Sequence, residues 1–347
     1  MKSFCAPGTG WRTRADSAAR PRTAAQPLCY HQAMTLTELR YIVAVARERH
    51  FGRAAETCFV SQPTLSVAVK KLEDELGVVL FERGGGEITP TPIGARIVEQ
   101  AMRVLEQADQ ISHIAAHGRD PLAGPLRVGA IFTIAPYLLP RVIPVLHRKA
   151  PQMPLLIEED YTAKLAARLK NGELDVIVIS LPFQEPGLAV QPVYEEPFVV
   201  ALPAEHRWRD RKSIDAQELA RENLLLLGAG HCFRDQVLQV CPECQRSSAA
   251  GTLQRTLEGG SLETIRQMVA TGAGITVLPC TSVGANPASD RLTVMRAFRK
   301  PVPVRQVALA WRRSFPRGEA VEALRQAVLR SRLPCVTFRP DATIEQY

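Results

Sequence analysis

The sequence predicts two folded units joined by one long helix: a small helical unit near the N-terminus and a larger two-lobed α/β unit. Three observations predict this division. Apolar residues recur with helical spacing from residue 36 to residue 76, one uninterrupted helix is expected from residue 91 to residue 117, and strand and helix patterns alternate from residue 126 onward. The 347 residues suffice for two or three units that each bury a core.

Residues 1 to 33 precede the first of these patterns. Five Lys and Arg residues against Asp16 alone place +4 of the formal net charge of +8 before Met34. The segment lacks apolar periodicity, so we expect it to be disordered and interpret it as an over-extended start. An Arg-rich leader with few acids is also typical of an organelle transit peptide. The rest of the chain is too weakly basic to predict nucleic-acid binding from charge alone.

Cysteine usage and hydropathy bear on the compartment. Eight cysteines are scattered over the chain, unlike the dense framework of a small secreted domain, which favours mostly reduced thiols. No apolar run reaches the roughly 18 residues that a membrane span needs. The N-terminus also lacks the apolar core of a signal peptide. We therefore expect a cytoplasmic protein without a membrane partner.

Residues 34 to 91 are expected to form a winged helix-turn-helix. A first helix is expected after Met34, with apolar positions on one face from Leu36 to Ala46, and two more are expected over 51 to 58 and 62 to 76, with a short turn before the last. Ser61 suits the N-cap of the last helix, Pro63 its first turn, and Gly77 its end. Two short apolar stretches then flank a triple glycine, as in a small hairpin or wing.

Residues 92 to 120 are expected to form a linker and dimerisation helix. Its apolar positions repeat with spacings of four and three, which is typical of a coiled-coil seam. The alternative is that the stripe packs on its own domain, but a helix between two domains has little local core to pack on. The seam positions are Ile97, Ala101, Val104, Ala108, Ile111 and Ala115.

Residues 121 to 340 are expected to form the two-lobed effector domain. Pro121 and Gly124-Pro125 mark the hinge before it. The alternation of strands and helices predicts an α/β domain with parallel strands, whose two lobes enclose a ligand cleft. The strands are expected over 126–131, 155–159, 174–179, 198–202, 224–227, 275–278 and 304–311, and the helices over 137–149, 164–170, from 231, 261–270 and 319–330.

The start of the third helix suits contact with double-stranded DNA. Its polar side chains can reach base edges or phosphates, and residues 40 to 71 carry a charge balance of +4. The alternative is an ordinary three-helix bundle with a solvated polar face. The candidate DNA-contacting residues are Gln62, Pro63, Thr64, Ser66 and Lys70.

A family resemblance decides between these two readings. The stretch FGRAAETCFVSQPTLSVAVKKLEDELGVVLFER, followed by TPIGARI, resembles the DNA-binding head of the LysR-type transcription regulators. The resemblance implies a periplasmic-binding-protein-like effector domain at the C-terminus. It also implies a homotetramer built as a dimer of dimers, binding to operator DNA and contact with RNA polymerase.

Cys232 is a candidate reactive thiol. It follows His231, precedes Arg234 and Asp235, and begins a predicted helix. A helix N-terminus and a nearby cation favour the thiolate, which is the form that attacks peroxide. The alternative is a buried, inert cysteine, since free cysteines are often core residues.

Cys241 lies nine residues beyond Cys232. In one continuous helix the two would be about 13 Å apart along the axis, whereas a disulfide needs Cα atoms within roughly 7 Å. Joining them would require the helix to unwind, and such a change of shape is what a switch needs.

Four segments resemble the peroxide-sensing members of the same family: GHCFRDQ at 230 to 236 with Cys241, 124 to 144, 261 to 279, and 300 to 312. The resemblance implies hydrogen peroxide as the signal, an activator of oxidative-stress genes, and reset by cellular thiol reductants. It implies Cys232 as the peroxidatic and Cys241 as the resolving cysteine. It further assigns Thr133, Thr162, His231, Asp235 and Arg305 to the peroxide pocket. Taken singly, each of these residues is equally compatible with a capping, turn or surface role.

Some alternatives remain open at this point. Cys244 forms a Cys-Pro-Glu-Cys run with Cys241, and this spacing can compete for the disulfide or bind a metal; without a second ligand pair nearby we expect neither a metal nor a cofactor. Cys58, Cys280 and Cys335 receive no role. The competing functions are a LysR-type regulator of an organic effector, a thiol peroxidase and a solute-binding protein. The DNA-binding head argues against an enzyme and against a transport protein.

Overall fold

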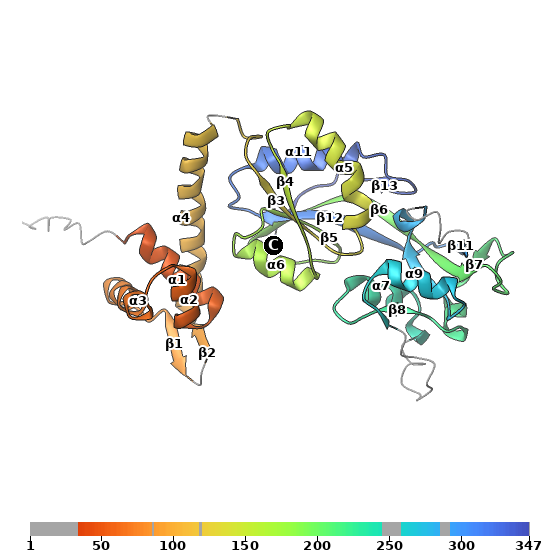
Figure 1. The fold of residues 1–347 in the computed structure, drawn as a ribbon, viewed down its shortest axis with the longest axis horizontal. Coiled ribbons are helices and arrows are strands. Elements are labelled where there is room, and N and C mark those ends of the chain that lie inside the picture. Colours follow the sequence, from red (N-terminus) through yellow and green to blue (C-terminus); the bar gives the residue numbers. More distant parts are fainter. Residues whose placement is uncertain (1–33, 85–86, 118–119, 245–257, 285–291, 347) are drawn as a thin grey trace, which may run out of the picture. The chain divides into compact units, whose positions relative to one another are not determined.

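The computed structural model describes residues 34–84, 87–117, 120–244, 258–284 and 292–346 (Figure 1). The expectation of disorder for residues 1 to 33 lies outside the described residues. Among the described residues, no helix is both long and apolar enough to cross a membrane.

The N-terminal part is built from three helices and a two-stranded wing. Ser61 accepts a hydrogen bond from the Thr64 amide at 3.3 Å and so caps the third helix, which ends at Gly77 with φ of 68°. Ile42, Leu65 and Leu72 are fully buried between the helices. The elements are α1 (Leu36–Glu48), α2 (Phe51–Thr57), α3 (Gln62–Leu76), β1 (Phe81–Gly84) and the antiparallel β2 (Glu87–Pro90).

A long helix, α4 (Pro92–His117), follows the wing. Its first turns complete the core of the N-terminal part, where Val98 and Ala101 are buried. Further along, Val104 is 37% exposed and Ile111 is 71% exposed. The expected seam is therefore covered near its start and open to solvent farther on.

The first lobe of the C-terminal part is a sheet covered by helices. Strand β3 (Leu126–Ala130) pairs in parallel with β4 (Leu155–Glu159) and with β5 (Val176–Ser180). All five residues of β5 are buried, as expected for a strand covered on both faces. The helices are α5 (Ala135–Lys149), α6 (Thr162–Lys170) and α11 (Gly318–Leu329).

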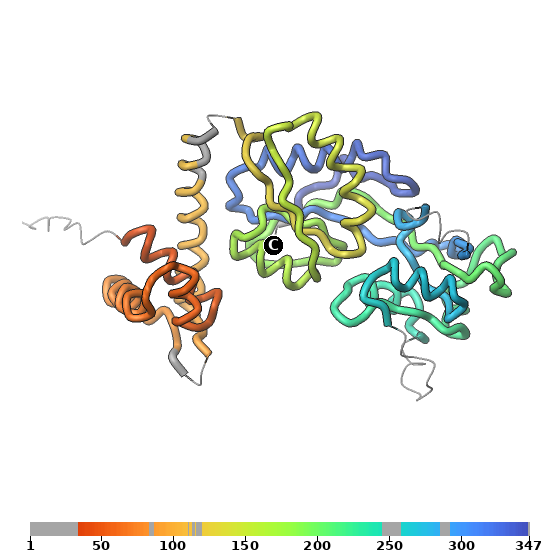
Figure 2. Tube along the Cα trace, viewed as in Figure 1, coloured from red at the N-terminus to blue at the C-terminus, as the bar shows by residue number. Residues whose placement is uncertain are grey.

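Two long strands connect this lobe to the second. Strand β6 (Leu188–Pro203) runs antiparallel to β12 (Val304–Arg312), and β12 also runs antiparallel to β5. Figure 2 shows the chain passing from one lobe to the other along these strands. The expectation of parallel strands is confirmed for β3, β4 and β5, and the chain returns along β12, which runs antiparallel to β5 and β6.

The second lobe contains α7 and a separate apolar core around Phe198, Trp208 and Phe233. Strands β10 and β11 both pair antiparallel with the end of β6. The elements are β7 (Ser213–Ile214), η1 (Ala216–Arg221), β8 (Leu226–Leu227), α7 (Cys232–Val240), β9 (Glu258–Gly259), α9 (Leu262–Ala270), β10 (Thr276–Pro279), η3 (Cys280–Ser282) and β11 (Thr293–Phe298). The chain ends with β13 (Thr337–Phe338) and β14 (Glu345–Gln346) on β6.

Candidate redox and DNA-binding sites

Cys232 is the first residue of α7. His231 is the N-cap residue, and the helix buries Phe233, Val237 and Leu238 against the second lobe. The Cys232 thiol is half-buried and unbonded, and it packs against the core of the first lobe. The candidate reactive thiol therefore lies where the two lobes meet. It is at the N-terminus of α7, where the helix dipole stabilises negative charge.

An aromatic cluster holds the start of α7 against the first lobe. The Tyr161 ring lies 4.8 Å from the His231 ring and 5.4 Å from the Phe132 ring, while Phe132 and His231 are 5.8 Å apart, all measured between ring centroids. Each pair packs edge to face, which is the favoured arrangement of aromatic rings. Because Tyr161 is the N-cap residue of α6, the N-termini of α6 and α7 are brought together.

Two buried polar atoms near this cluster have no hydrogen-bond partner among the described residues: His231 Nε2 and Thr162 Oγ1. His231 is 5% exposed, and burial lowers the pKa of its imidazole, with a hydrogen bond to the Gly260 backbone opposing this. The imidazole is consequently neutral near pH 7. Buried polar groups almost always have partners, so these two atoms are candidates to bind water or a small polar ligand.

Thr133 is held by Arg305. The guanidinium donates to Thr133 Oγ1 and to the Thr133 carbonyl, each at 2.9 Å. The same guanidinium donates to the Glu196 carboxylate at 2.7 Å and lies 5.1 Å from the Phe233 ring centroid. Because the Thr133 oxygen accepts from Arg305, its hydroxyl hydrogen remains to be donated elsewhere.

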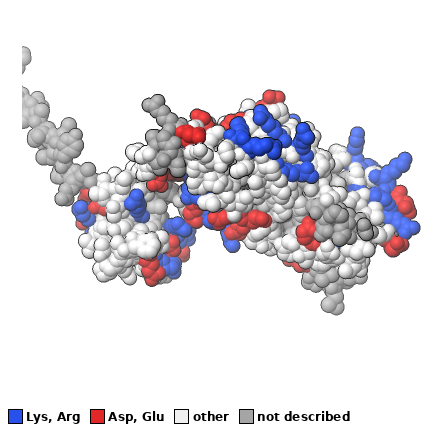
Figure 3. Space-filling model, turned by 45° about the horizontal axis from the view of Figure 1, so that its top comes forward, with Lys and Arg blue, Asp and Glu red and all other residues white. Residues whose placement is uncertain are grey.

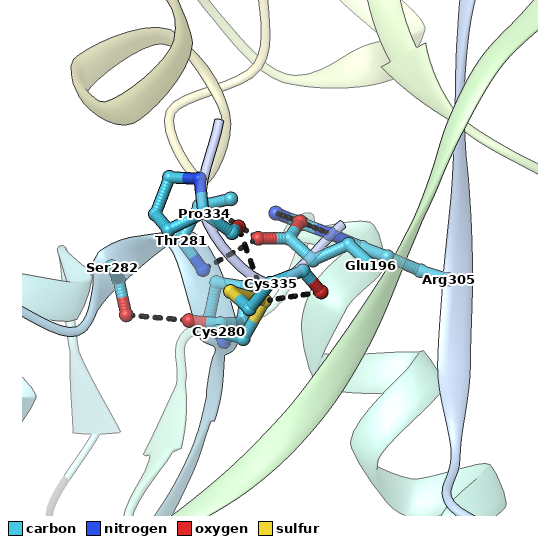
Figure 4. The surroundings of a disulfide bond; sticks show 8 residues. Glu196, Cys280, Thr281, Ser282, Arg305, Pro334 and Cys335 are labelled. Atoms are coloured by element: carbon cyan, nitrogen blue, oxygen red, sulfur yellow. Dashed lines mark hydrogen bonds and ion pairs between the residues drawn. A yellow bond between two sulfur atoms is a disulfide. The ribbon is translucent and has the colours of Figure 1, made fainter. Parts of the chain in front are cut away.

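A disulfide lies beside this ion pair (Figure 4). Cys280 and Cys335 are bonded, with Cα atoms 6.3 Å apart and a sequence separation of 55. The next residue, Thr281, donates its amide hydrogen to Glu196 at 2.9 Å and its hydroxyl hydrogen to the same oxygen. The disulfide thus fastens the C-terminal segment to the turn that carries the Glu196 contact.

The second bonded pair is Cys241 with Cys244, whose Cα atoms are 5.5 Å apart. Cys241 is the C-cap of α7, and both residues are buried. The expectation of mostly reduced thiols was wrong for these four cysteines, and so was the absence of a role for Cys280 and Cys335. The reason is that the fold brings each pair within the Cα separation of a disulfide, which spacing along the chain does not reveal.

The predicted pocket residues fall into two pairs, and Asp235 lies apart from both. Thr133 and Arg305 are in direct contact, and Thr162 and His231 are joined through Tyr161. Asp235 is exposed in the first turn of α7. Sequence reasoning missed three residues of this region, namely Phe132, Tyr161 and Glu196. Glu196 is opposite Arg305 in the β6–β12 register, which only the folded sheet defines.

Four of the candidate DNA-contacting residues lie in the first turns of α3, and Lys70 lies near the middle of this helix. Gln62, Pro63 and Thr64 are exposed and Ser66 is half-buried. Lys70 is exposed and forms an ion pair with Asp74 at 2.9 Å. Two apolar residues that the sequence analysis did not single out are also exposed to solvent: Phe59 is 95% exposed and Val67 is 68% exposed. On the face drawn in Figure 3, basic and acidic side chains of this part are interspersed.

The described residues contain no group of three or more His, Cys, Asp or Glu side chains that could hold a metal ion. The Cys-Pro-Glu-Cys run is accounted for by its disulfide.

Two family models match the chain. The model of the bacterial regulatory helix-turn-helix protein, lysR family, matches residues 36–95, and the model of the LysR substrate binding domain matches residues 119–332. The DNA-binding transcriptional dual regulator OxyR of Escherichia coli is 38% identical over 296 residues, which are 85% of this chain and 95% of that protein. A probable hydrogen peroxide-inducible genes activator of Streptomyces viridosporus is also 38% identical, over 294 residues, 85% of this chain and 93% of that protein.

Solved structures agree with these matches. A cysteine-to-aspartate variant of full-length OxyR from Pseudomonas aeruginosa aligns with a TM-score of 0.68 and 54% identity, covering 86% of this chain and 98% of that one. A hydrogen-peroxide-bound cysteine-to-serine mutant of OxyR from Corynebacterium glutamicum aligns with a TM-score of 0.58 and 32% identity, covering 86% and 92%.

Proposed function

Because this chain belongs to the LysR family of DNA-binding transcription regulators and is an OxyR-like activator of hydrogen-peroxide-inducible genes, we propose that it senses hydrogen peroxide through Cys232 in the cytoplasm. The family regulates transcription and is not a family of enzymes. The winged helix-turn-helix and the two-lobed effector domain are those of the family.

One observation carries the proposal: Cys232 is an unbonded thiol at the first residue of α7, immediately after a buried imidazole nitrogen that lacks a partner. Peroxide donates and accepts hydrogen bonds, so His231 Nε2 and Thr162 Oγ1 suit it as partners. Thr133, fixed by Arg305, contributes a second hydroxyl to the proposed pocket. Asp235, exposed in the first turn of α7, is the proposed polar neighbour of this pocket.

The reaction starts with attack of the Cys232 thiolate on one peroxide oxygen. The O–O bond breaks, the sulfur becomes a sulfenic acid, and the second oxygen leaves as water after taking a proton. The Cys241 thiolate then displaces the sulfenic hydroxyl as water, forming the Cys232–Cys241 disulfide. This step requires Cys241 to be released from Cys244, and it requires α7 to unwind, because nine residues of helix separate the two cysteines by about 13 Å. Cellular thiols reset the switch.

The test is disulfide mapping by mass spectrometry, using fully reduced protein before and after one equivalent of hydrogen peroxide. We expect a peroxide-dependent Cys232–Cys241 bond that is lost in Cys232→Ser. Cys58→Ser is the matched control, because Cys58 is the other described free cysteine and lies in the N-terminal part. If Cys232 stays an unmodified thiol at every time after exposure, from the earliest quench onward, and no Cys232–Cys241 bond forms, the proposal is refuted and an organic effector is favoured.

For the DNA-binding half we propose that Gln62, Pro63, Thr64 and Ser66 face base edges and phosphates, while Lys70 contacts the backbone. The exposed N-terminal end of α3 supports this assignment, since recognition helices contact bases with that end. The protein acts as a dimer of dimers on double-stranded operator DNA and contacts RNA polymerase. Gln62→Ala is expected to relax base preference at one position by about 1–3 kcal/mol. Lys70→Ala is expected to weaken binding to all DNA sequences alike. It should also reduce, by about one, the slope of the logarithm of the binding constant against the logarithm of salt concentration.

A further inference from the structure

Cys241 can form a disulfide with Cys244 or with Cys232, and only the disulfide with Cys244 is compatible with an intact α7. The bond to Cys244 is closed with α7 intact, with Cα atoms 5.5 Å apart. The bond to Cys232 must span the whole of α7, whose Cα atoms at the two ends are about 13 Å apart along the axis. Only the second bond requires the helix to unwind, because a disulfide tolerates at most about 7 Å between Cα atoms.

Unwinding α7 removes contacts that the intact helix makes. Gln236 Nε2 donates to Ser180 Oγ at 2.9 Å and to the Leu181 carbonyl at 3.0 Å. Arg234 donates to the Leu227 carbonyl at 2.7 Å, and Phe233 is 2% exposed in the core of the second lobe. A protein with the Cys232–Cys241 bond loses these interactions, whereas one with the Cys241–Cys244 bond keeps them. Exchange from the first bond to the second is therefore favoured by the fold.

From this difference we infer that Cys244 is a second resolving cysteine, which takes the disulfide over from Cys232 and returns the sensor thiol to its reduced form. This inference rests on the proposed reaction of Cys232 with peroxide. The Cys244 thiolate attacks the Cys241 sulfur of the Cys232–Cys241 disulfide. The bond between Cys232 and Cys241 breaks, Cys232 leaves as a thiolate, and the Cys241–Cys244 bond forms.

The exchange balances without a further oxidant or reductant, since one disulfide is consumed and one is made. Its two electrons were already removed by peroxide in the first step. Cys244 is three residues from Cys241, so once the segment is unwound the attacking thiolate is tethered beside its target and the step is intramolecular.

The consequence for signalling is an active state that ends by itself. After the exchange Cys232 is a thiol again and α7 can re-form, while the oxidising equivalent is stored in the Cys241–Cys244 bond. A second pulse of peroxide then finds no free resolving cysteine until that bond has been reduced. A groove of about 620 Å³, lined in part by Cys241, Pro242 and Lys300, lies beside the Cys241 end of this bond, on the side from which we expect a small thiol reductant to approach.

The experiment follows all three cysteines over time. Full-length protein is reduced with dithiothreitol, freed of reductant without air, given one equivalent of hydrogen peroxide, and quenched at intervals by acid and alkylation before mass spectrometry. In the wild type we expect the Cys232–Cys241 bond to rise and then decay at the rate at which the Cys241–Cys244 bond appears. In Cys244→Ser we expect the Cys232–Cys241 bond to persist at least about tenfold longer. Cys58→Ser serves as control and follows the wild type.

The outcomes separate this inference from the function on which it rests. A Cys232–Cys241 bond that persists in the wild type while Cys244 stays a thiol overturns the relay and leaves the peroxide sensor intact. If Cys244→Ser or the second variant Cys244→Ala leaves the lifetime of the Cys232–Cys241 bond unchanged, the relay is likewise overturned and the peroxide sensor stays intact. A Cys232 thiol that never reacts overturns both.

Discussion

Arg305 and Glu196 form an ion pair in which neither side chain is exposed, with Nε donating to the carboxylate at 2.7 Å. The two residues come from adjacent strands, β12 and β6, at opposed positions in the register. The same guanidinium donates hydrogen bonds to both oxygen atoms of Thr133. A single buried pair thus connects the strands that join the lobes to a threonine of the candidate peroxide pocket.

We predict that Glu196→Ala destabilises the protein by about 3–5 kcal/mol, because it leaves the Arg305 cation buried without its counter-charge. Urea denaturation followed by tryptophan fluorescence measures this, since Trp208 is buried in the second lobe. Glu195→Ala is the matched control. Its carboxylate is partly exposed and paired with Arg339 at 2.6 Å, so the loss should stay below about 1 kcal/mol. Equal denaturation midpoints for the two variants would contradict the prediction.

A pH effect is expected from His231. Burial lowers the pKa of this imidazole below its ordinary value of 6.5 in the folded protein. Below pH 6.5 the unfolded chain therefore binds a proton that the folded protein binds less readily. The contribution to stability is fully present above the unfolded pKa and is lost as the pH falls below it.

The measurement compares the wild type with His231→Gln, which does not titrate, in urea denaturation from about pH 7.5 to about pH 5.5. The wild type should lose more stability than the variant over this range, while the remaining histidines contribute equally to both. If the two proteins respond to pH in parallel, the imidazole is not buried in its neutral form.

The disulfide between Cys280 and Cys335 should stabilise the folded state. It closes a loop across a sequence separation of 55 residues, and a bond of this kind contributes roughly 2–4 kcal/mol by restricting the unfolded chain. The double variant Cys280→Ala/Cys335→Ala should therefore unfold at lower urea than the oxidised wild type. Cys58→Ala, which breaks no bond, should stay within about 1 kcal/mol. Indistinguishable midpoints for the double variant and the wild type would show that the bond does not contribute.

Local patterns predicted the local structure well. Helix α7 was expected from about residue 231 and begins at Cys232, because a polar N-cap and a run of apolar residues at helical spacing define it without reference to the rest of the chain. The same holds for Ser61 and Gly77 at the ends of α3. The alternation of strands and helices predicted the two α/β lobes, the family resemblance implied their periplasmic-binding-protein-like architecture, and the family models confirm that fold class.

Contacts between distant segments could not be predicted. Strand β6 was expected over 198–202 only, yet it begins at Leu188, because Pro192 and Pro197 interrupt the strand pattern in the sequence. The pairing of Glu196 with Arg305 depends on a register that forms only between these long strands. The fold likewise brings Cys280 to Cys335, 55 positions apart in sequence. Of the three site residues missing from the sequence prediction, Glu196 lies in the sheet, Phe132 in a turn and Tyr161 at the N-cap of α6, and each meets its partners only through the tertiary fold.

The last prediction concerns α4. Its seam residues are covered near the start of the helix, but Ile111 is 71% exposed within one chain, so an apolar stripe remains for a second copy. Burying an isoleucine contributes about 1.5–3 kcal/mol, and a symmetric dimer buries two. Ile111→Asp should therefore raise the dissociation constant between the α4 helices at least about 100-fold. Arg103→Asp is the control, because it changes the charge by more than Ile111→Asp does but lies outside the seam.

Analytical ultracentrifugation measures the assembly of both variants. We expect Arg103→Asp to remain a tetramer and Ile111→Asp to sediment as a dimer that is held by the effector domains alone. A tetramer that survives Ile111→Asp at micromolar protein would mean that the seam packs on its own chain and that another surface joins the dimers.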